Sequence, residues 1–375
     1  MKKTLLAMLM AVCTLAATAQ EKTASAQEKT ADSTSRPAKW YDNIKFSGYG
    51  MLQYQYEDRE GTDHNYFNLR LARMMLDGQI SDFDWRVQIQ ATSAKGPGEP
   101  TVMLVDLYAE WRKFEWLRIK GGEFKRPFSF ENPMNPINQG FYAYANVINS
   151  LVGFGDRTGE KNSSGRDVGI QLQGDFLKNH SGRNLLHYQI GVFNGEGINS
   201  WDKNHGKDII GGIWVAPIQG LRIGAFGWTG SRGGMTDPDT QETVSIRKNR
   251  YAFSAEYDRN EYTFRAEYIH SYGWGATGAG STTIDYSRGN KADGWYVLGI
   301  VPVIKSRLHA KARYQCYRDN SEWNRSKTMY EIGINFFINK YLQLNVEYAR
   351  VNDRTIADPD KHNYNLFDAQ FDVRF

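Results

Sequence analysis

The sequence has few cysteines and no long apolar segment beyond its N-terminus. Of the 2 cysteines in 375 residues, Cys13 lies within the N-terminal apolar stretch. If that stretch is removed, Cys316 is alone and no intrachain disulfide forms, which excludes a small secreted domain held together by disulfides. Beyond residue 19, no apolar run approaches the roughly 18 residues that a membrane-spanning helix needs. A helical membrane protein is therefore excluded as well.

The sequence also lacks a strong charge of one sign and any metal-binding motif. Its formal net charge is +4, and removal of Lys2 and Lys3 with residues 1–19 would leave a value near +2. This balance carries no signal for nucleic acid, so we expect no nucleic-acid partner. The 7 histidines are scattered, and no pair has the spacing of metal ligands. We therefore expect neither a metal nor a cofactor.

The N-terminus has the three parts of a secretory signal peptide. Basic residues at positions 2 and 3 precede an apolar core from Leu5 to Leu15, and Ala17-Thr18-Ala19 forms an A-x-A cleavage site. A lipoprotein modified at Cys13 fits less well, because Val12 precedes the cysteine and the apolar run continues beyond it. The sequence predicts export after removal of residues 1–19.

Residues 20–43 are polar and contain the tandem repeat AQEKTAS and AQEKTAD. Without apolar periodicity, they are predicted to form a flexible periplasmic segment before a single domain at 44–375.

From residue 44 onward, apolar and polar residues alternate with the period of a β-strand. In residues 83–90, for example, aromatic and aliphatic residues occupy the odd positions and polar residues the even ones. Alternation of lipid-facing and water-facing residues is typical of transmembrane barrels, and about sixteen such segments predict an all-β, antiparallel transmembrane β-barrel. The expected strands are 44–57, 66–80, 83–93, 101–112, 116–126, 166–178, 185–194, 208–217, 220–230, 247–258, 261–272, 293–303, 306–318, 327–338, 341–351 and 363–375.

The expected connections alternate between short turns and longer polar loops. Residues 81–82, 218–219 and 339–340 are short turns, whereas residues 195–207 and 231–246 are long loops. Short periplasmic turns and longer external loops are typical of bacterial outer-membrane barrels, whereas a soluble β-sandwich has no reason to sort its connections in this way. The predicted location is therefore the outer membrane, in contact with its lipid.

The longest connection joins the predicted strands 116–126 and 166–178. At about forty residues it is far longer than usual, which requires either a functional reason or disorder. Its aromatic residues argue against disorder. They are Phe128, Phe130, Phe141, Tyr142 and Tyr144. We predict that this third external loop folds into the lumen of the barrel.

Basic residues on the expected inner face are the candidate pore lining, because Arg and Lys select anions in pores and the guanidinium fork suits phosphate. The candidates are Arg70, Arg86, Arg118, Lys120, Lys125, Arg126, Arg307, Lys311 and Arg313. Acidic residues share this expected face, which weakens the argument for any single cation. They are Asp84, Asp106, Glu110, Glu256, Glu267, Glu331 and Glu347.

Gly121-Gly122 interrupts the alternation of the fifth strand. A bulge there would turn Phe124 outward and Glu123 and Lys125 inward, at the root of the long loop. The alternative is that Lys125 and Arg126 are rim residues facing solvent, and the sequence does not separate the two interpretations.

Enzyme signatures are weak. A serine–histidine lipase, or a protease that uses Asp63 and His64, would need a triad assembled through space. Isolated histidines are more often structural, so we expect no enzymatic activity.

The chain resembles the phosphate-selective porin O and P family. The resemblance rests on GGEFKRPFSFENP (121–133), GRDVGIQLQG (165–174), the Arg-rich FNLRLARMMLDGQI (67–80) and the terminal Phe375. It implies a sixteen-stranded homotrimeric porin whose third loop constricts the pore, with a basic lining for small anions such as phosphate. It also implies that Phe375 is read by the barrel-assembly machinery.

Three functions follow as hypotheses. The first is an outer-membrane porin for passive diffusion of small anions, including phosphate or polyphosphate. The second is a general or oligosaccharide-type porin in which Phe141, Tyr142 and Tyr144 form a stacking track. The third is a barrel enzyme or surface adhesin with a sealed lumen.

Overall fold

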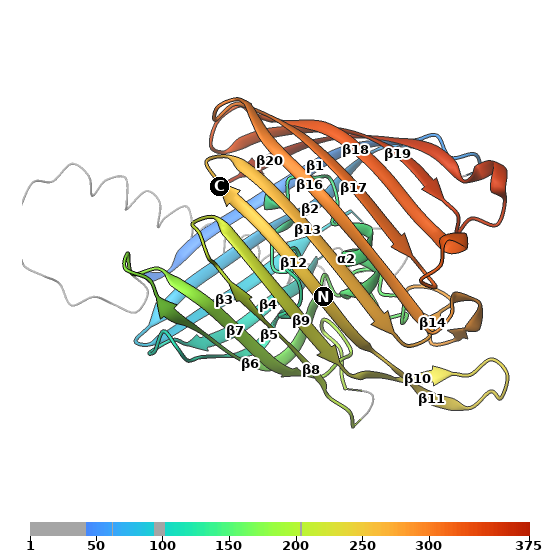
Figure 1. Ribbon diagram of the computed structural model, residues 1–375, viewed down its shortest axis with the longest axis horizontal. Helices are drawn as coiled ribbons and strands as arrows, with labels where there is room; N and C mark the ends of the chain where they lie inside the picture. Colours follow the sequence, from blue (N-terminus) through green and yellow to red (C-terminus); the bar gives the residue numbers. More distant parts are fainter. Residues whose placement is uncertain (1–42, 62, 94–101, 203–204) are drawn as a thin grey trace, which may run out of the picture.

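The alternating segments form sixteen antiparallel strands that close into a barrel in the computed structural model, which describes residues 43–61, 63–93, 102–202 and 205–375 (Figure 1). The predicted signal peptide and all but the last residue of the predicted periplasmic segment lie outside the described residues. The barrel strands are β1 (Lys45–Glu57), β2 (His64–Ile80), β3 (Phe83–Ala91), β4 (Val102–Trp111), β5 (Arg118–Lys125), β6 (Arg166–Lys178), β7 (Asn184–Phe193), β8 (Asp208–Val215), β9 (Leu221–Thr229), β12 (Asn249–Arg259), β13 (Tyr262–Tyr272), β16 (Lys291–Ile304), β17 (Leu308–Arg318), β18 (Ser326–Phe337), β19 (Leu342–Asp353) and β20 (Asn363–Arg374).

The predicted fold class is confirmed. Each barrel strand pairs with the next in the chain, and β1 pairs with β20 to close the sheet. Phe375 follows β20, and its ring centroid lies 6.0 Å from that of Phe46, so the end of the chain packs beside the first strand.

The two faces of the barrel wall differ as the alternation requires. Apolar side chains such as Ile170, Phe253, Val297 and Ile332 are 56–62% exposed on the outer face. Polar and charged side chains on the alternate positions are mostly buried among one another inside. An outer apolar surface of this kind suits a lipid environment. Among the described residues, no helix has the length and apolar character needed to cross a membrane.

Two small hairpins extend the barrel where the sequence predicted only loops. They are formed by β10 (Ser231–Thr236) with β11 (Thr243–Arg247), and by β14 (Gly275–Ala276) with β15 (Ile284–Asp285). Met235, Ile246, Ala276 and Ile284 form a shared core between them. The β10–β11 hairpin projects beyond the rim of the barrel (Figure 1).

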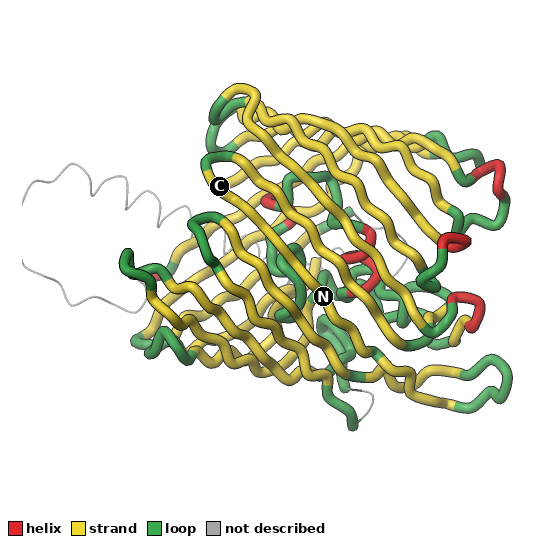
Figure 2. Tube along the Cα trace, in the orientation of Figure 1, coloured by secondary structure: helices red, strands yellow, loops and turns green. Residues whose placement is uncertain are grey.

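The connection between β5 and β6, residues 126–165, is here called the interior segment. It contains the 3-10 helix η3 (Pro136–Asn138) and the short helix α2 (Asn146–Leu151), which lies between the walls of the barrel (Figures 1 and 2). The remaining short helices occur in other connections. They are η4 (Tyr286–Arg288), η5 (Trp323–Arg325) and η6 (Pro359–Lys361).

Candidate functional site

Aromatic packing attaches the interior segment to the inner wall. The Phe128 ring lies 5.5 Å from Trp228, and the Phe130 ring lies 5.4 Å from Phe226, both in edge-on geometry. The buried side chains of α2 join the same cluster, together with residues of β13, β16 and β17. Burial of each large apolar side chain contributes about 1.5–3 kcal/mol, so this side of the lumen is closed by a hydrophobic core.

Glu267 on β13 holds the backbone of the interior segment. Its carboxylate accepts hydrogen bonds from the backbone N–H groups of Phe130 at 2.8 Å and Glu131 at 2.9 Å, and from the Tyr296 hydroxyl at 2.7 Å. Burial raises the pKa of the Glu131 carboxyl. A carboxylate that accepts two consecutive backbone N–H groups fixes the path of the chain at this point.

Lys311 and Arg313 of β17 also hold the interior segment. Lys311 pairs with Glu347 at 2.8 Å and donates to the Gly140 carbonyl at 2.9 Å. Arg313 pairs with Glu331 and donates to the Ala143 carbonyl at 3.0 Å. Because both cations are buried and neutralised, their predicted role as an anion-selective lining loses its structural basis, and they act as anchors.

A buried ion network fixes the two ends of the interior segment. Arg126 donates to Glu160 and to Asp167, each at 2.9 Å, and all three side chains are almost fully buried. Lys248 extends the network by pairing with Asp208 at 2.8 Å. Buried charges of this kind need their partners, because loss of one leaves the other without solvation.

Arg250 forms a second anchor through a two-pronged contact with Asp156. Its Nη1 and Nη2 atoms donate to the carboxylate at 2.7 and 2.8 Å, and Nη1 also donates to the Leu151 carbonyl at the end of α2. Burial alone would raise the pKa of Asp156, but the attraction and hydrogen bonds of Arg250 outweigh it and hold the pKa below the usual 3.8.

The depressed pKa of Asp156 predicts a pH-dependent contribution to the anchoring of the interior segment. A carboxylate with a lowered folded-state pKa stabilises the fold above its unfolded pKa, and this stabilisation is lost as the pH falls through the folded value. We expect Asp156→Asn to reduce hydrogen-exchange protection of residues 153–165 at pH 7 by about 3 kcal/mol. The difference from wild type is expected to shrink below about pH 4. Equal differences at pH 7 and pH 3 would contradict this role.

A cavity of about 240 Å³ remains between the interior segment and the inner wall of β3–β7. Its lining combines basic side chains with amides and aromatic rings. The lining residues are Arg86, Asp106, Tyr108, Lys120, Phe124, Lys125, Arg126, Pro127, Pro133, Asn135, Arg166, Gln171, Gln173 and Gln189. It is thus lined by five cationic residues and one carboxylate.

Four of these five cations are paired with carboxylates. The pairs are Arg86–Asp77 at 2.6 Å, Lys120–Glu110 at 3.2 Å, Arg126 with Glu160 and Asp167, and Arg166–Asp106 at 2.7 Å. Such pairing reduces the field that each cation projects into the cavity.

Lys125 differs from the other four. Its Nζ donates to the carbonyls of Asn132 at 2.5 Å and Met134 at 2.9 Å, and to the Tyr144 hydroxyl at 3.0 Å. Within the described part of the chain, each of these hydrogen bonds goes to a neutral group, so the ammonium charge is uncompensated at close range. Among the described residues that line the cavity, Lys125 is therefore the cation without a carboxylate at ion-pair distance.

Two arginines of β2, elsewhere on the inner wall, also donate their side-chain hydrogen bonds to neutral groups. Arg70 donates to the Gln370 amide oxygen at 2.7 Å, and Arg73 donates to the Gln90 amide oxygen at 2.8 Å and to the Tyr49 hydroxyl at 3.1 Å. Arg73 and the cavity residue Arg166 were absent from the candidate lining. Both lie in the segments 67–80 and 165–174, on which the family resemblance rests. These motifs therefore contain inward arginines that the alternation of single residues did not identify.

One of the predicted lining residues lies elsewhere. Arg307 lies exposed in the turn between β16 and β17 rather than on an inward strand position. Arg118 is on β5, where it pairs with Asp175 at 2.7 Å beside Glu110. The turn begins at residue 305, directly after Ile304, and β17 begins at Leu308, two residues later than predicted. Arg307 therefore lies in the turn and not in the barrel wall.

The bulge at Gly121-Gly122, one of the two interpretations left open by the sequence, does not form. β5 pairs with β4 and β6 without a shift in register, so Lys120 and Phe124 stay on one face. Phe124 is buried and its ring lies 5.5 Å from Lys120 Nζ, not outward as the bulge required. Lys125 nevertheless reaches the interior segment, because β5 ends at this residue.

Gly122 has a structural role that predicts a measurable effect. Its φ is +132°, and a Cβ there would lie 2.2 Å from the Leu107 carbonyl oxygen, whereas a Cβ at Gly121 would meet open space. We expect Gly122→Ala to cost about 2–4 kcal/mol through strain and overpacking. The folded fraction, read from heat-modifiable migration on a gel, should fall for Gly122→Ala and stay unchanged for Gly121→Ala. Equal behaviour of the two variants would contradict the steric argument.

The aromatic stacking track is not available in this structure. Phe141 is 3% exposed beneath Lys311 and Arg313, and Tyr144 is 5% exposed beside Phe154. Phe141 and Tyr144 are part of the core that anchors the interior segment. Tyr142 is half-buried against a separate cluster that includes Met329 and Leu366, so the three rings do not form one exposed track.

Within the described ranges, no group of three or more His, Cys, Asp or Glu side chains is arranged to hold a metal. The candidate protease residue His64 has its Nε2 atom 3.2 Å from the Gln55 amide oxygen and its ring stacked on Tyr66.

The comparison with known proteins identifies the fold. No family model and no curated protein sequence matches this chain. An anion-selective porin from Comamonas acidovorans matches with a TM-score of 0.64 and 10% identity, over 88% of this chain and 99% of that one. Salmonella typhi OmpF, solved in complex with daunomycin, matches with a TM-score of 0.62 and 14% identity, over 89% and 98%. Pseudomonas putida OprB matches with a TM-score of 0.59 and 9% identity, over 89% and 94%. The chain therefore has the β-barrel fold of outer-membrane porins.

Proposed function

We propose that this protein is an outer-membrane porin for passive diffusion of small anions, and that solutes pass the interior segment on the side of β3–β7. The observation that carries the proposal is the placement of Lys125. Its ammonium group lines the cavity and bonds to neutral groups. The hydrophobic core of the interior segment packs against β9, β13, β16 and β17 and borders the cavity at Phe124.

The charges around the cavity support selection of anions. The five cationic side chains reach the cavity lining together with one partner acid, Asp106, whereas the other partner acids Asp77, Glu110, Glu160 and Asp167 are not among its lining residues. A narrow passage with cationic walls raises the local concentration of anions and repels cations. The similarity of fold to an anion-selective porin is consistent with this proposal.

The arginines of the cavity favour small anions over tight binding of phosphate. Arg166 already uses Nε and Nη2 on the Asp106 carboxylate, at 2.7 and 3.1 Å, and Arg86 Nε contacts Asp77. A guanidinium fork occupied in this way is less available for a two-pronged phosphate contact. We therefore include phosphate as a permeating solute and not as a ligand held in the pore.

The test is charge-dependent labelling of a cysteine placed in the cavity. Gln173 lines the cavity on β6, and the native Cys316 is buried, so wild type is a suitable background. We expect Gln173→Cys to react with a sulfonate-bearing methanethiosulfonate at least about tenfold faster than with its trimethylammonium counterpart, a ratio equivalent to about 1.4 kcal/mol. Labelling with the sulfonate reagent should reduce the single-channel conductance.

The control is a cysteine at the exposed turn residue Ser306, where the two reagents are expected to react at similar rates. Labelling of Gln173→Cys that leaves conductance unchanged would place the pathway elsewhere. Faster reaction with the cationic reagent would contradict anion preference.

A further inference from the structure

A second cavity lies on the outer wall of the barrel, across β7, β8, β9, β12 and β13. Its volume is about 590 Å³, within the range of about 300–1,000 Å³ typical of small-molecule sites. Gly211 on β8 and Gly227 on β9 occupy outward positions and face each other in the register, and the lack of a side chain at both leaves the wall recessed there.

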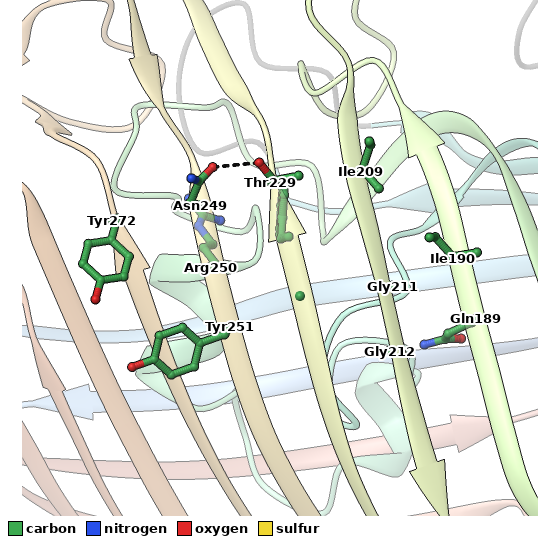
Figure 3. A pocket seen from close by; sticks show the side chains of 12 residues that line it. Gln189, Ile190, Ile209, Gly211, Gly212, Thr229, Asn249, Arg250, Tyr251 and Tyr272 are labelled. Carbon is green, nitrogen blue, oxygen red and sulfur yellow. Dashed lines mark hydrogen bonds between the residues drawn. The ribbon is translucent and has the colours of Figure 1, made fainter.

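The sides of this outer groove are apolar and aromatic. Ile190 and Ile209 flank it on β7 and β8, and Tyr251 and Tyr272 flank it on β12 and β13 (Figure 3). All four side chains are substantially exposed on the outer surface. An apolar recess on a lipid-facing wall suits a hydrocarbon chain better than a water-soluble ligand.

One end of the groove is polar and then cationic. The Thr229 hydroxyl donates to the Asn249 amide oxygen at 3.1 Å at the upper end of the groove (Figure 3). Arg247 is exposed and lies two residues before Asn249. Lys291 is also exposed; it is opposite Tyr272 in the strand register, and its Nζ lies 5.8 Å from the centroid of the Tyr272 ring. Both cations are at the barrel end from which the long connections 230–248 and 273–290 leave.

We propose that the outer groove binds an anionic acyl lipid of the outer leaflet, with one chain along Gly211 and Gly227 and a phosphate headgroup near Arg247 and Lys291. The charge complementarity selects this occupant. A second copy of the chain would require a broad interface of about 800 Å² on each partner, whereas the feature here is a narrow recess ending at two cations. Exposed Lys and Arg near a membrane surface each attract anionic lipid.

The first test fills the groove. A Cβ at Gly227 would meet open space, so Gly227→Leu is expected to fold and to occupy the chain position. Gly121→Leu is the matched control, since Gly121 also has open space around its Cβ position and lies on β5, away from the groove. Native mass spectrometry in detergent with added phosphatidylglycerol should show a lipid adduct for wild type and Gly121→Leu, reduced about tenfold for Gly227→Leu.

The second test removes the charges without altering the groove. The double variant Arg247→Gln with Lys291→Gln changes only exposed side chains, and folding is checked by heat-modifiable migration. We expect its phosphatidylglycerol adduct to fall to the level of phosphatidylcholine, which carries no net charge. Equal retention of both lipids by wild type, an adduct unaffected by Gly227→Leu, or a loss of oligomers instead of lipid in that variant would each overturn the proposal.

Discussion

Lys125→Glu is expected to convert the anion preference of the channel into a cation preference. The substitution changes the local charge by two units at the cavity, where the native ammonium group bonds to three neutral acceptors. Two unit charges 4 Å apart interact by about 4 kcal/mol at an effective dielectric constant near 20. Even a fraction of this, about 1.4 kcal/mol, changes the permeability ratio tenfold. Reversal potentials in a salt gradient across a planar bilayer measure the ratio.

Two controls separate charge from packing. Lys125→Gln keeps N–H donors for the carbonyls of Asn132 and Met134 but removes the charge, so its selectivity should fall between wild type and Lys125→Glu. Lys305→Glu makes the same charge change in the exposed turn after β16 and should leave the reversal potential nearly unchanged. If Lys125→Glu and Lys305→Glu behave alike, Lys125 does not face the solute pathway.

Arg250→Met is expected to release the interior segment and raise both the mean conductance and its fluctuations. Arg250 supplies both charged contacts to Asp156 and a hydrogen bond to the Leu151 carbonyl. Its loss leaves the buried Asp156 carboxylate with hydrogen bonds from Thr158 but without its paired cation, at a cost of about 3–5 kcal/mol, a large part of the stability of a local element. Single-channel recordings at pH 7 measure the change.

A second variant shows whether the unpaired charge causes this release. Asp156→Asn combined with Arg250→Met removes both charges, and a neutral pair of similar size costs less than a single buried ion. We expect the double variant to be quieter than Arg250→Met alone. If the double variant is at least as noisy, the anchoring comes from the hydrophobic core around Phe128 and α2 and not from the ion pair.

The barrel was predictable because its physical signal is local and repeated. Each strand exposes one face to lipid and one to polar groups, and none of the predicted strand boundaries is more than two residues from the observed one. Phe124 shows where this reasoning fails. The face on which Phe124 lies depends on whether the strand has a bulge at Gly122. The register of β5 with β4 and β6 decides this, and that register cannot be read from the sequence of β5 alone.

The charged lining was less predictable because pairing is a property of the assembled barrel. Lys311 and Lys125 both have inward-reaching ammonium groups, yet Lys311 faces Glu347 across two strands and Lys125 faces backbone carbonyls of the interior segment. Neither contact can be read from the sequence, because the partners come together only when the barrel and the interior segment are folded. Alternation identifies which side chains enter the lumen and leaves open which of them retain an unbalanced charge.

The most direct test of the central claim is the zero-current potential of the wild-type protein in a planar bilayer with a tenfold gradient of potassium chloride. A cation-walled passage predicts a potential with the sign of chloride preference, which weakens as ionic strength rises and screens the lining charges. A potential with the sign of potassium preference would contradict anion selectivity, and a membrane that shows no conductance would contradict the porin itself.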